Sequence, residues 1–224
     1  MDISILYEDN HVLVVEKPVN IPVQEDRSQD KDVLTILKED IKVRFKKPGN
    51  VYLGLVHRLD RPVGGVMVFA KTSKAGSRLS DVIRRNALNR TYLAVTEGRP
   101  LQKKGTLTDY LSKDTKRNIV RVVPTSHKGG KKAVLDYEVL AEKSGFSIIK
   151  VRLHTGRPHQ IRVQLAHAGM PIYGDQKYAK GTPGGQQISL WAHELSFPHP
   201  TKKDINTYTS YPPNEFPWNM WELK

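Results

Sequence analysis

The feature that most constrains this chain is a series of short apolar segments with the period of β-strands. In residues 133–139 and 149–153, every second residue is apolar and its neighbours are polar. A period of two places the apolar side chains on one face, so each segment is expected to form a half-buried strand. Further short apolar runs that we expect to be strands occupy residues 3–7, 12–17, 66–70 and 188–193.

Apolar residues at helical spacing are found in three stretches. The first covers residues 33–41, and the second follows Thr72 or Ser73, either of which can cap a helix. The third is a short helix in which Pro158 is expected to be the first residue.

These elements together predict the fold class. Strands outnumber helices, and several neighbouring strands are joined by connections too short for helical crossovers. We therefore predict an α+β fold with a mixed, largely antiparallel β-sheet flanked by helices and loops. The sequence contains no internal repeat and no domain linker, so we expect one domain over residues 1–224.

The charge of the chain restricts its partners. Lysine and arginine number 36 against 23 aspartates and glutamates, which gives a net charge of +13 and a pI of about 9.8. Such an excess suits a polyanion, of which nucleic acid is the commonest, although it can also serve solubility alone. Composition does not distinguish RNA from DNA.

Two absences exclude whole classes of protein. The chain has no cysteine, which excludes disulfides, zinc ribbons and thiolate catalysis. The first residues include acids where a signal peptide carries a basic and then an apolar segment, and no apolar stretch is long enough to span a bilayer. We therefore expect a cytoplasmic protein that does not associate with membranes.

The densest group of functional side chains runs from His57 to Gly65 and places Asp60 between Arg58 and Arg61. The proline and glycines that follow favour a sharp turn. Flanking arginines stabilise the ionised carboxylate. Taken alone, this pattern is more typical of an ion-paired surface turn than of a catalytic site.

Two further segments carry candidate chemistry. Residues 154–162 contain two arginines, two histidines and a glutamine at an expected strand-to-helix junction, where backbone donors favour anions. Residues 90–92, Arg-Thr-Tyr, place Tyr92 near the start of an expected strand. By itself Tyr92 is more typical of a half-buried packing residue than of one that stacks on a base.

In their order along the chain, these segments resemble the motifs of the RluA-type pseudouridine synthase family. His-Arg-Leu-Asp followed by a turn of small residues is matched by residues 57–65. A basic residue, any residue and Tyr are matched by residues 90–92. Gly-Arg-x-His-Gln-x-Arg is matched by residues 156–162, trailed by residues 169–175. The resemblance extends from about residue 3 to about residue 200.

Two positions depart from the family pattern. Members commonly have Thr-Ser-Gly after the aspartate, whereas this chain has Val63-Gly64-Gly65 and so lacks two hydroxyls around the loop. The basic residue before Tyr92 is Arg90, where lysine is more usual. Many members also carry a small S4-like RNA-binding domain ahead of the catalytic domain, and we expect this chain to consist of the catalytic domain only.

The resemblance implies an isomerase that converts uridine in RNA to pseudouridine without a cofactor or metal. It assigns Asp60 as the catalytic carboxylate, Tyr92 as the residue that stacks on the flipped base, and Arg162 as the partner of Asp60, with Arg157 as the alternative. Whether Asp60 attacks C1′ or abstracts a sugar proton is left open. The other residues expected to contact RNA are His57, Arg58, Arg61, Arg90, Lys131, Lys132, Arg157, His159 and Gln160.

Two other functions are compatible with parts of the sequence. A metal-dependent nuclease would draw on the histidines and Asp60, but their spacing matches no common metal motif and acids are sparse. The histidines concerned are His57, His154, His159, His167 and His193. The second alternative is a catalytically silent RNA-binding protein with the same basic surface. The sequence leaves the RNA open, ribosomal or transfer, and we expect a monomer with no protein partner.

Overall fold

The computed structural model describes residues 3–26, 28–98, 100 and 102–223. The chain divides into two compact units, which are described here one at a time. The first unit comprises Met1–Asn89 and Ala192–Tyr211, and the second comprises Arg90–Trp191 and Pro212–Lys224. The expectation of a single domain over residues 1–224 stays a prediction.

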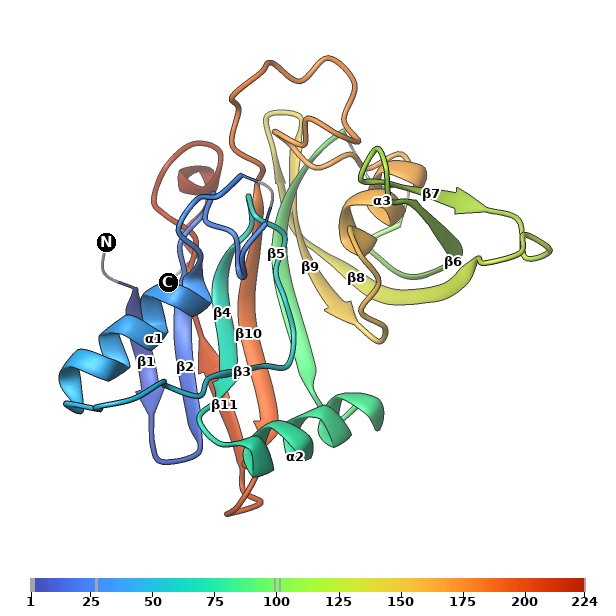
Figure 1. Cartoon of the computed structure of the whole chain (residues 1–224). Coiled ribbons are helices and arrows are strands. Elements are labelled where there is room, and N and C mark those ends of the chain that lie inside the picture. The colour runs from blue at the N-terminus through green and yellow to red at the C-terminus, as the bar shows by residue number, and fades with distance from the viewer. Residues whose placement is uncertain (1–2, 27, 99, 101, 224) are drawn as a thin grey trace. The chain divides into compact units, whose positions relative to one another are not determined.

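The first unit is built on a mixed, mostly antiparallel sheet. Its strands lie in the order β1-β2-β4-β10, with β11 paired to β10 and β3 paired to β4 (Figure 1). Val14 lies opposite Val68, so apolar side chains of neighbouring strands share a face. The strand bounds are β1 Ser4–Glu8, β2 Val12–Lys17, β3 Gly54–Leu55, β4 Gly64–Ala70, β10 Leu190–Pro198 and β11 Ile205–Thr209.

Two helices belong to the first unit, α1 (Val33–Arg44) and α2 (Ser73–Arg84). Asp32 caps α1 by accepting a hydrogen bond from the amide of Thr35 at 3.0 Å, and Thr72 caps α2 through its hydroxyl. The buried face of α2 packs on the sheet in one apolar cluster. That cluster contains Ala75, Leu79 and Val82 of α2 with Val12, Val14, Val66, Val68, Leu195 and Phe197 of the strands.

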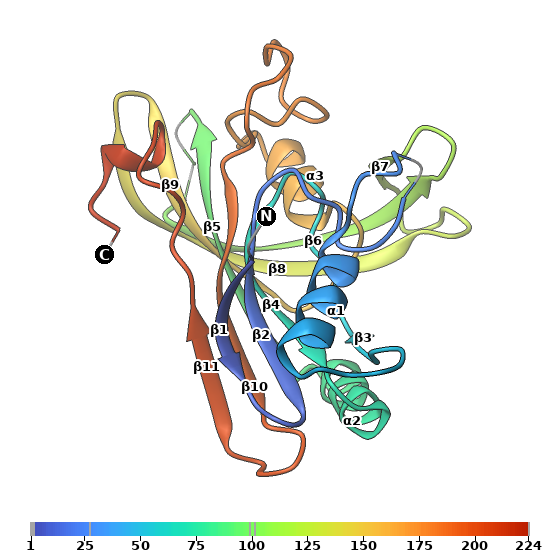
Figure 2. The same ribbon diagram turned by 60° about the vertical axis from the view of Figure 1, so that its left-hand side comes forward.

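The second unit has its own antiparallel strands in the order β5-β9-β8-β6-β7. Helix α3 (Gln160–His167) lies against β6 and β7, as Figures 1 and 2 both show. Val163 of α3 packs there with Leu111, Val120 and Ala133. The strand bounds are β5 Asn89–Glu97, β6 Lys104–Asp114, β7 Ile119–Val123, β8 Lys131–Lys143 and β9 Phe146–Leu153.

The described residues thus form eleven strands, three α-helices and a short 3₁₀ helix at Trp218–Met220. The predicted fold class, a mostly antiparallel sheet with helices, is confirmed. No helix in the described part of the chain is both long and apolar enough to cross a membrane.

Two element boundaries were predicted wrongly: the strand expected at residues 188–193 is β10, Leu190–Pro198, and the helix expected from Pro158 starts later. Helix α3 begins at Gln160 and not at Pro158, because a tight turn precedes it in which the amide of Gln160 donates to the carbonyl of Arg157 at 3.2 Å. His159, the residue before the helix, has a left-handed backbone with a φ of 51°. Proline cannot adopt a positive φ, so it could not occupy position 159; Pro158 directly precedes that residue.

Candidate active site

Asp60 lies in the loop between β3 and β4 of the first unit. Leu59 and Val63, on either side of it, are buried, whereas Asp60 is half-buried and Arg58 is exposed. The carbonyl of Asp60 accepts a hydrogen bond from the amide of Val63 at 3.0 Å, which closes a turn. The buried apolar residues anchor this loop and leave the carboxylate in a partly desolvated place.

The end of this loop requires a glycine at residue 65. Gly65 has a φ of 115°, and a Cβ there would lie 2.2 Å from the carbonyl oxygen of Ala192 in β10. Both the backbone conformation and the close approach of β10 exclude a side chain. Val63, which stands where the family commonly has threonine, is buried. The sequence predicted a sharp turn here, but not its packing against β10.

Lys17, at the end of β2, is a residue that the sequence analysis missed. Its side chain is fully buried, and Nζ donates to the carbonyl oxygens of Pro18 at 2.6 Å and Arg61 at 3.0 Å. Burial lowers the pKa of Lys17 to about 7, while the charge of Asp60 acts in the opposite direction and that of Arg61 adds to the lowering. Lys17 therefore fixes the loop backbone next to Asp60 and interacts electrostatically with that carboxylate. A lysine that ends an apolar strand was the available signal.

Two predicted RNA contacts of this loop already have partners in the first unit. Arg61 donates to the carbonyl of Asn20 at 3.1 Å and to Oγ of Ser28 at 3.0 Å, and it forms an ion pair with Asp30. Nε2 of His57, a half-buried residue, accepts from the amide of Val68 at 3.1 Å. These contacts hold the loop in shape, and the role of Arg61 and His57 in RNA contact stays a prediction.

In the second unit, Tyr92 and Arg90 belong to β5. Tyr92 is buried and lies opposite Val151 of β9. Arg90 lies against Gly156, where a Cβ would come within 2.6 Å of Nη1 of the arginine. The structure thus brings together residues 90–92 and the turn before α3, two segments that the sequence could only place in order.

The turn that precedes α3 is stabilised by Gln160. Its Oε1 accepts from the hydroxyl of Thr155 at 2.8 Å and the amide of Arg157 at 2.9 Å, and its Nε2 donates to the carbonyl of Val134 at 3.1 Å. Only 3% of Gln160 is exposed. Arg157 in turn donates from Nε to the carbonyl of Lys132 at 2.9 Å. In this structure Gln160 and Arg157 hold the turn against β8. The sequence analysis predicted RNA contact for both residues and did not predict this structural role. RNA contact by Gln160 and Arg157 stays a prediction.

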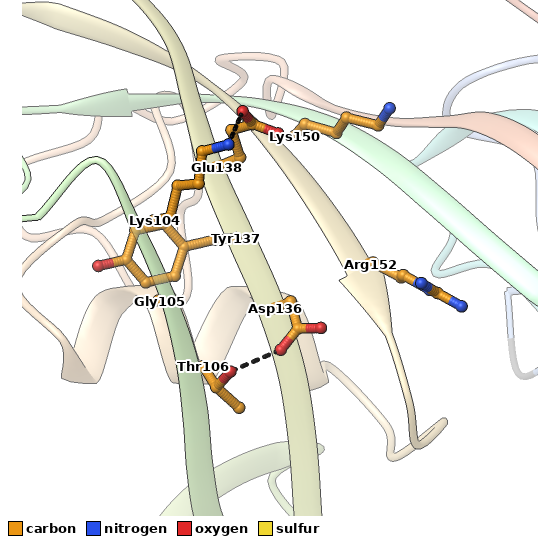
Figure 3. Close-up of a pocket in the computed structure, with 8 residues that line it drawn as sticks. All are labelled: Lys104, Gly105, Thr106, Asp136, Tyr137, Glu138, Lys150 and Arg152. Carbon is orange, nitrogen blue, oxygen red and sulfur yellow. Dashed lines mark hydrogen bonds and ion pairs between the residues drawn. The ribbon is translucent and has the colours of Figure 1, made fainter.

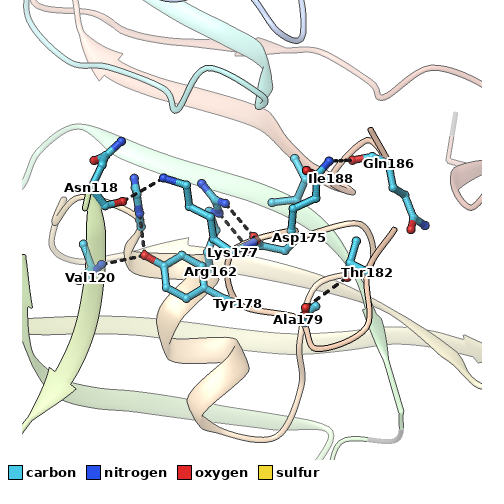
Figure 4. A network of polar contacts seen from close by, with 12 residues as sticks. Asn118, Val120, Arg162, Asp175, Lys177, Tyr178, Ala179, Thr182, Gln186 and Ile188 are labelled. Carbon is cyan, nitrogen blue, oxygen red and sulfur yellow. Dashed lines mark hydrogen bonds and ion pairs between the residues drawn. The ribbon is translucent and has the colours of Figure 1, made fainter. Parts of the chain in front are cut away.

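Arg162, on α3, is buried and held by side chains of the second unit. Nε and Nη2 donate to Oδ2 and Oδ1 of Asp175 at 2.8 and 2.7 Å (Figure 4). The guanidinium lies 5.3 Å from the ring centre of Tyr178. Tyr178 also bonds through its hydroxyl to Nδ1 of His159 at 2.7 Å. Asp175 and Tyr178 were not predicted as site residues, although Asp175 ends the segment that trails the third motif.

The predicted catalytic residues fall in both units. Asp60 belongs to the first unit, and Tyr92 and Arg162 belong to the second. The pairing of Asp60 with Arg162 rather than with Arg157 therefore stays a prediction. Lys131 and Lys132 are the first two residues of β8 and are exposed; their contact with RNA stays a prediction.

The second unit also carries an open pocket of about 450 Å³ on β6, β8 and β9 (Figure 3). Asp136 lies in it, and hydrogen bonds from Thr106 at 2.7 Å and from His154 at 2.6 Å hold the pKa of that carboxyl below its usual range. None of the predicted site residues lines this pocket. Its lining consists of Lys104, Gly105, Thr106, Asp136, Tyr137, Glu138, Lys150 and Arg152.

Groups of metal ligands were also sought. Within residues 3–26, 28–98, 100 and 102–223, no three His, Asp or Glu side chains gather in a way that could hold a metal ion. The five histidines and Asp60 that a metal-dependent nuclease would use form no such group there.

Comparison with known proteins gives a consistent result. Residues 11–167 match the family described as RNA pseudouridylate synthase. The chain is 33% identical over 207 residues to an uncharacterized RNA pseudouridine synthase of Bacillus subtilis (strain 168), YhcT, which covers 91% of this chain and 67% of that protein. It is 34% identical over 178 residues to ribosomal large subunit pseudouridine synthase D of Haemophilus influenzae, with 79% of this chain and 52% of that protein covered.

A solved structure agrees with these sequence matches. Human RNA pseudouridylate synthase domain containing 4 superposes with a TM-score of 0.78 at 22% identity, and the match covers 94% of this chain and 88% of that one. At this identity the superposition establishes the fold, whereas the sequence matches establish descent. The family match includes Asp60, Tyr92 and Arg162 within residues 11–167. The chain belongs to the RNA pseudouridylate synthase family and is an RNA pseudouridine synthase.

Proposed function

We propose that this enzyme isomerises specific uridines of structured ribosomal RNA, with Asp60 as the catalytic carboxylate. Ribosomal RNA is favoured over transfer RNA because similar proteins are named ribosomal large subunit pseudouridine synthases. The assignment of Asp60 is supported by the environment of its carboxylate in the loop between β3 and β4. The carboxylate sits half-buried between two buried apolar anchors and interacts with the buried cation Lys17.

The reaction needs a carboxylate that is ionised and fixed in place. The bond between N1 of uracil and C1′ of ribose breaks, the base rotates, and C5 bonds to C1′; C5 loses a proton and N1 gains one, so the product is an isomer. Asp60 either attacks C1′ or removes a proton from the sugar. Both routes use its negative charge, which Lys17 and the proposed partner Arg162 stabilise.

The target uridine must leave its stack before the sugar–base bond can be reached. We assign Tyr92 to stacking on the extruded uracil and Arg58, which is exposed, to the space or strand left behind. The net charge of +13 and the exposed Lys131 and Lys132 provide contacts to the RNA backbone. We assign no cofactor, since no hydride, acyl or phosphoryl group moves.

The decisive test is the Asp60→Asn variant. The substitution keeps the size of the side chain and removes its charge and basicity, so we expect pseudouridine formation to be abolished while RNA affinity stays close to that of the wild type. Pseudouridine is measured in ribosomal RNA, transfer RNA and a short stem-loop after reaction with purified enzyme, with RNA binding measured in parallel. Deamidation of the variant is excluded by mass spectrometry.

Three outcomes distinguish the alternatives. Substantial turnover by Asp60→Asn overturns the assignment of the carboxylate. Tight binding without turnover by the wild-type chain on every RNA supports the silent RNA-binding protein instead. Turnover of transfer RNA alone corrects the substrate class and leaves the chemistry in place.

A further inference from the structure

Arg162 is fixed by an ion pair that is closed off from solvent. Only 6% of the Arg162 side chain and 1% of the Asp175 side chain are exposed. The two hydrogen bonds between them are parallel and join two planar groups, so they fix both the direction and the rotation of the guanidinium. Arg162 in this environment has one orientation.

Tyr178 supports the same guanidinium from its face. Its ring centre lies 5.3 Å from the guanidinium carbon, which is within the range of a cation–π contact. The ring is held in turn through its hydroxyl, which accepts from the amide of Val120 in β7 at 2.9 Å (Figure 4). The same hydroxyl bonds to Nδ1 of His159 at 2.7 Å. Tyr178 is therefore tied both to the edge strand of the sheet and to the residue before α3.

Asp175 is itself held in place by its own segment. Its Oδ1 accepts a second hydrogen bond, from the amide of Lys177 at 3.0 Å, and its carbonyl accepts from the amide of Ala179 at 2.9 Å. Its amide donates to the carbonyl of Ile172 at 3.1 Å. A carboxylate fixed in this way is a rigid support for the arginine and not a mobile counter-ion.

We propose that Asp175 and Tyr178 are positioning residues of the pseudouridine synthase reaction, which hold Arg162 in the orientation that it needs to orient Asp60. The proposal rests on the proposed function, because it takes Arg162 as the partner of the catalytic carboxylate. The clamp is formed through Nε and Nη2 of the guanidinium. Asp175 thus acts through Arg162 and touches neither the base nor the sugar.

The test compares single-turnover rates of Asp175→Asn and of the control Asp114→Asn at saturating enzyme. Asp114 is an exposed carboxylate at the end of β6, so its substitution changes the net charge by the same amount without disturbing a buried pair. We expect Asp175→Asn to slow the chemical step by about a hundredfold, the size of effect that a small misplacement of a catalytic group produces. RNA affinity and the rate of Asp114→Asn should be unchanged. Asp175→Glu, which keeps the charge, should recover part of the rate.

A double-variant cycle separates positioning from a general structural role. Arg162→Met combined with Asp175→Asn should be no slower than Arg162→Met alone, since the clamp has nothing left to hold. Additive losses overturn the proposal, and so does a wild-type rate in Asp175→Asn. A wild-type rate in Arg162→Met overturns it too, and Asp60→Asn then reports separately whether the proposed chemistry stands.

Tyr178 provides a second route to the same answer if Asp175→Asn does not fold, as a thermal unfolding scan would reveal. Tyr178→Phe keeps the ring under the guanidinium and loses only the hydroxyl contacts, whereas Tyr178→Leu loses the ring. We expect Tyr178→Leu to be the slower of the two variants, and its loss to disappear in the Arg162→Met background. Equal rates for wild type, Tyr178→Phe and Tyr178→Leu overturn the role of Tyr178.

Discussion

Each unit contains an ion pair between an aspartate and an arginine of a predicted functional motif. The Arg61–Asp30 pair is exposed to solvent, whereas the Arg162–Asp175 pair is buried. In the first unit, 43% of the Arg61 side chain and 52% of the Asp30 side chain are exposed. In the second, the corresponding fractions for Arg162 and Asp175 are 6% and 1%. The same pair of residue types therefore forms a solvated surface contact near Asp60 and a desolvated clamp on α3.

The two units differ in which positively chargeable side chain is buried and fixed. In the first unit the buried cation is Lys17, and it holds the loop through two backbone carbonyls instead of through a side chain. The Arg61 side chain is instead held at the surface by Asn20, Ser28 and Asp30. In the second unit the fixed group is Arg162 itself, which suits a residue whose task is orientation.

The largest expected effect is that of Arg162→Met on stability. It leaves the carboxylate of Asp175 buried without its partner, so the free energy of unfolding should fall by about 3–5 kcal/mol. Arg157→Met, which removes a hydrogen bond to a backbone carbonyl on a half-buried side chain, should cost about 1 kcal/mol. Urea unfolding of both variants gives the comparison. The reverse order would show that the buried clamp is not the main support of this turn.

Lys17→Met comes next, and its effect should depend on pH. Loss of the two hydrogen bonds leaves the carbonyls of Pro18 and Arg61 unsatisfied, at a cost of about 1–3 kcal/mol near pH 7. Folded Lys17 loses its proton above about pH 7, whereas an unfolded lysine keeps it to about 10.4. The unfolded state binds more protons in this window, so wild-type stability should rise with pH relative to the variant, by about 1.4 kcal/mol per pH unit at most.

Urea unfolding of wild type and Lys17→Met at pH values from about 6 to about 9.5 measures that difference. Below pH 7 both states of the wild type carry the proton, and the difference should be constant. A difference that stays constant above pH 7 as well would contradict a depressed pKa for Lys17.

Tyr92→Ala tests the predicted stacking in the second unit. The ring contributes roughly 1–3 kcal/mol if it stacks on the uracil, and Tyr92→Phe preserves the ring. We expect a lower single-turnover rate for Tyr92→Ala than for Tyr92→Phe, after both variants are shown to be folded, since Tyr92 is also buried. Equal loss in the two variants assigns the role to the hydroxyl instead.

The smallest effect is expected for Asp30→Asn, which breaks the exposed pair with Arg61. An ion pair between side chains this exposed contributes little to stability because solvent screens it, and salt weakens it further. Thermal unfolding at low and high salt should give nearly the same midpoint for the variant and the wild type. A loss as large as that of Arg162→Met would remove the contrast between the two pairs.

Much of the local structure could be predicted from the sequence, because its causes are local. The period of two in residues 133–139 and the capping hydroxyl of Thr72 act within a few residues, and β8 and α2 form where they indicate. The boundary of α3 was wrong because the turn before it depends on Gln160, whose side chain bonds to β8. The candidate residues Asp60, Tyr92 and Arg162 came from the order of motifs, which is also a property of the sequence alone.

Which charged groups are buried, and which partners hold them, depends on residues far apart in the sequence. Lys17 and the loop carbonyl of Arg61 are 44 residues apart, and Arg162 and Asp175 are 13 apart. Periodicity assigns a side chain to a face, but its burial and pKa depend on everything that packs around it. The sequence by itself therefore determined the family, the strand-rich fold and the candidate catalytic residues, whereas tertiary packing determined that a buried lysine fixes the loop of Asp60 and a buried aspartate fixes Arg162.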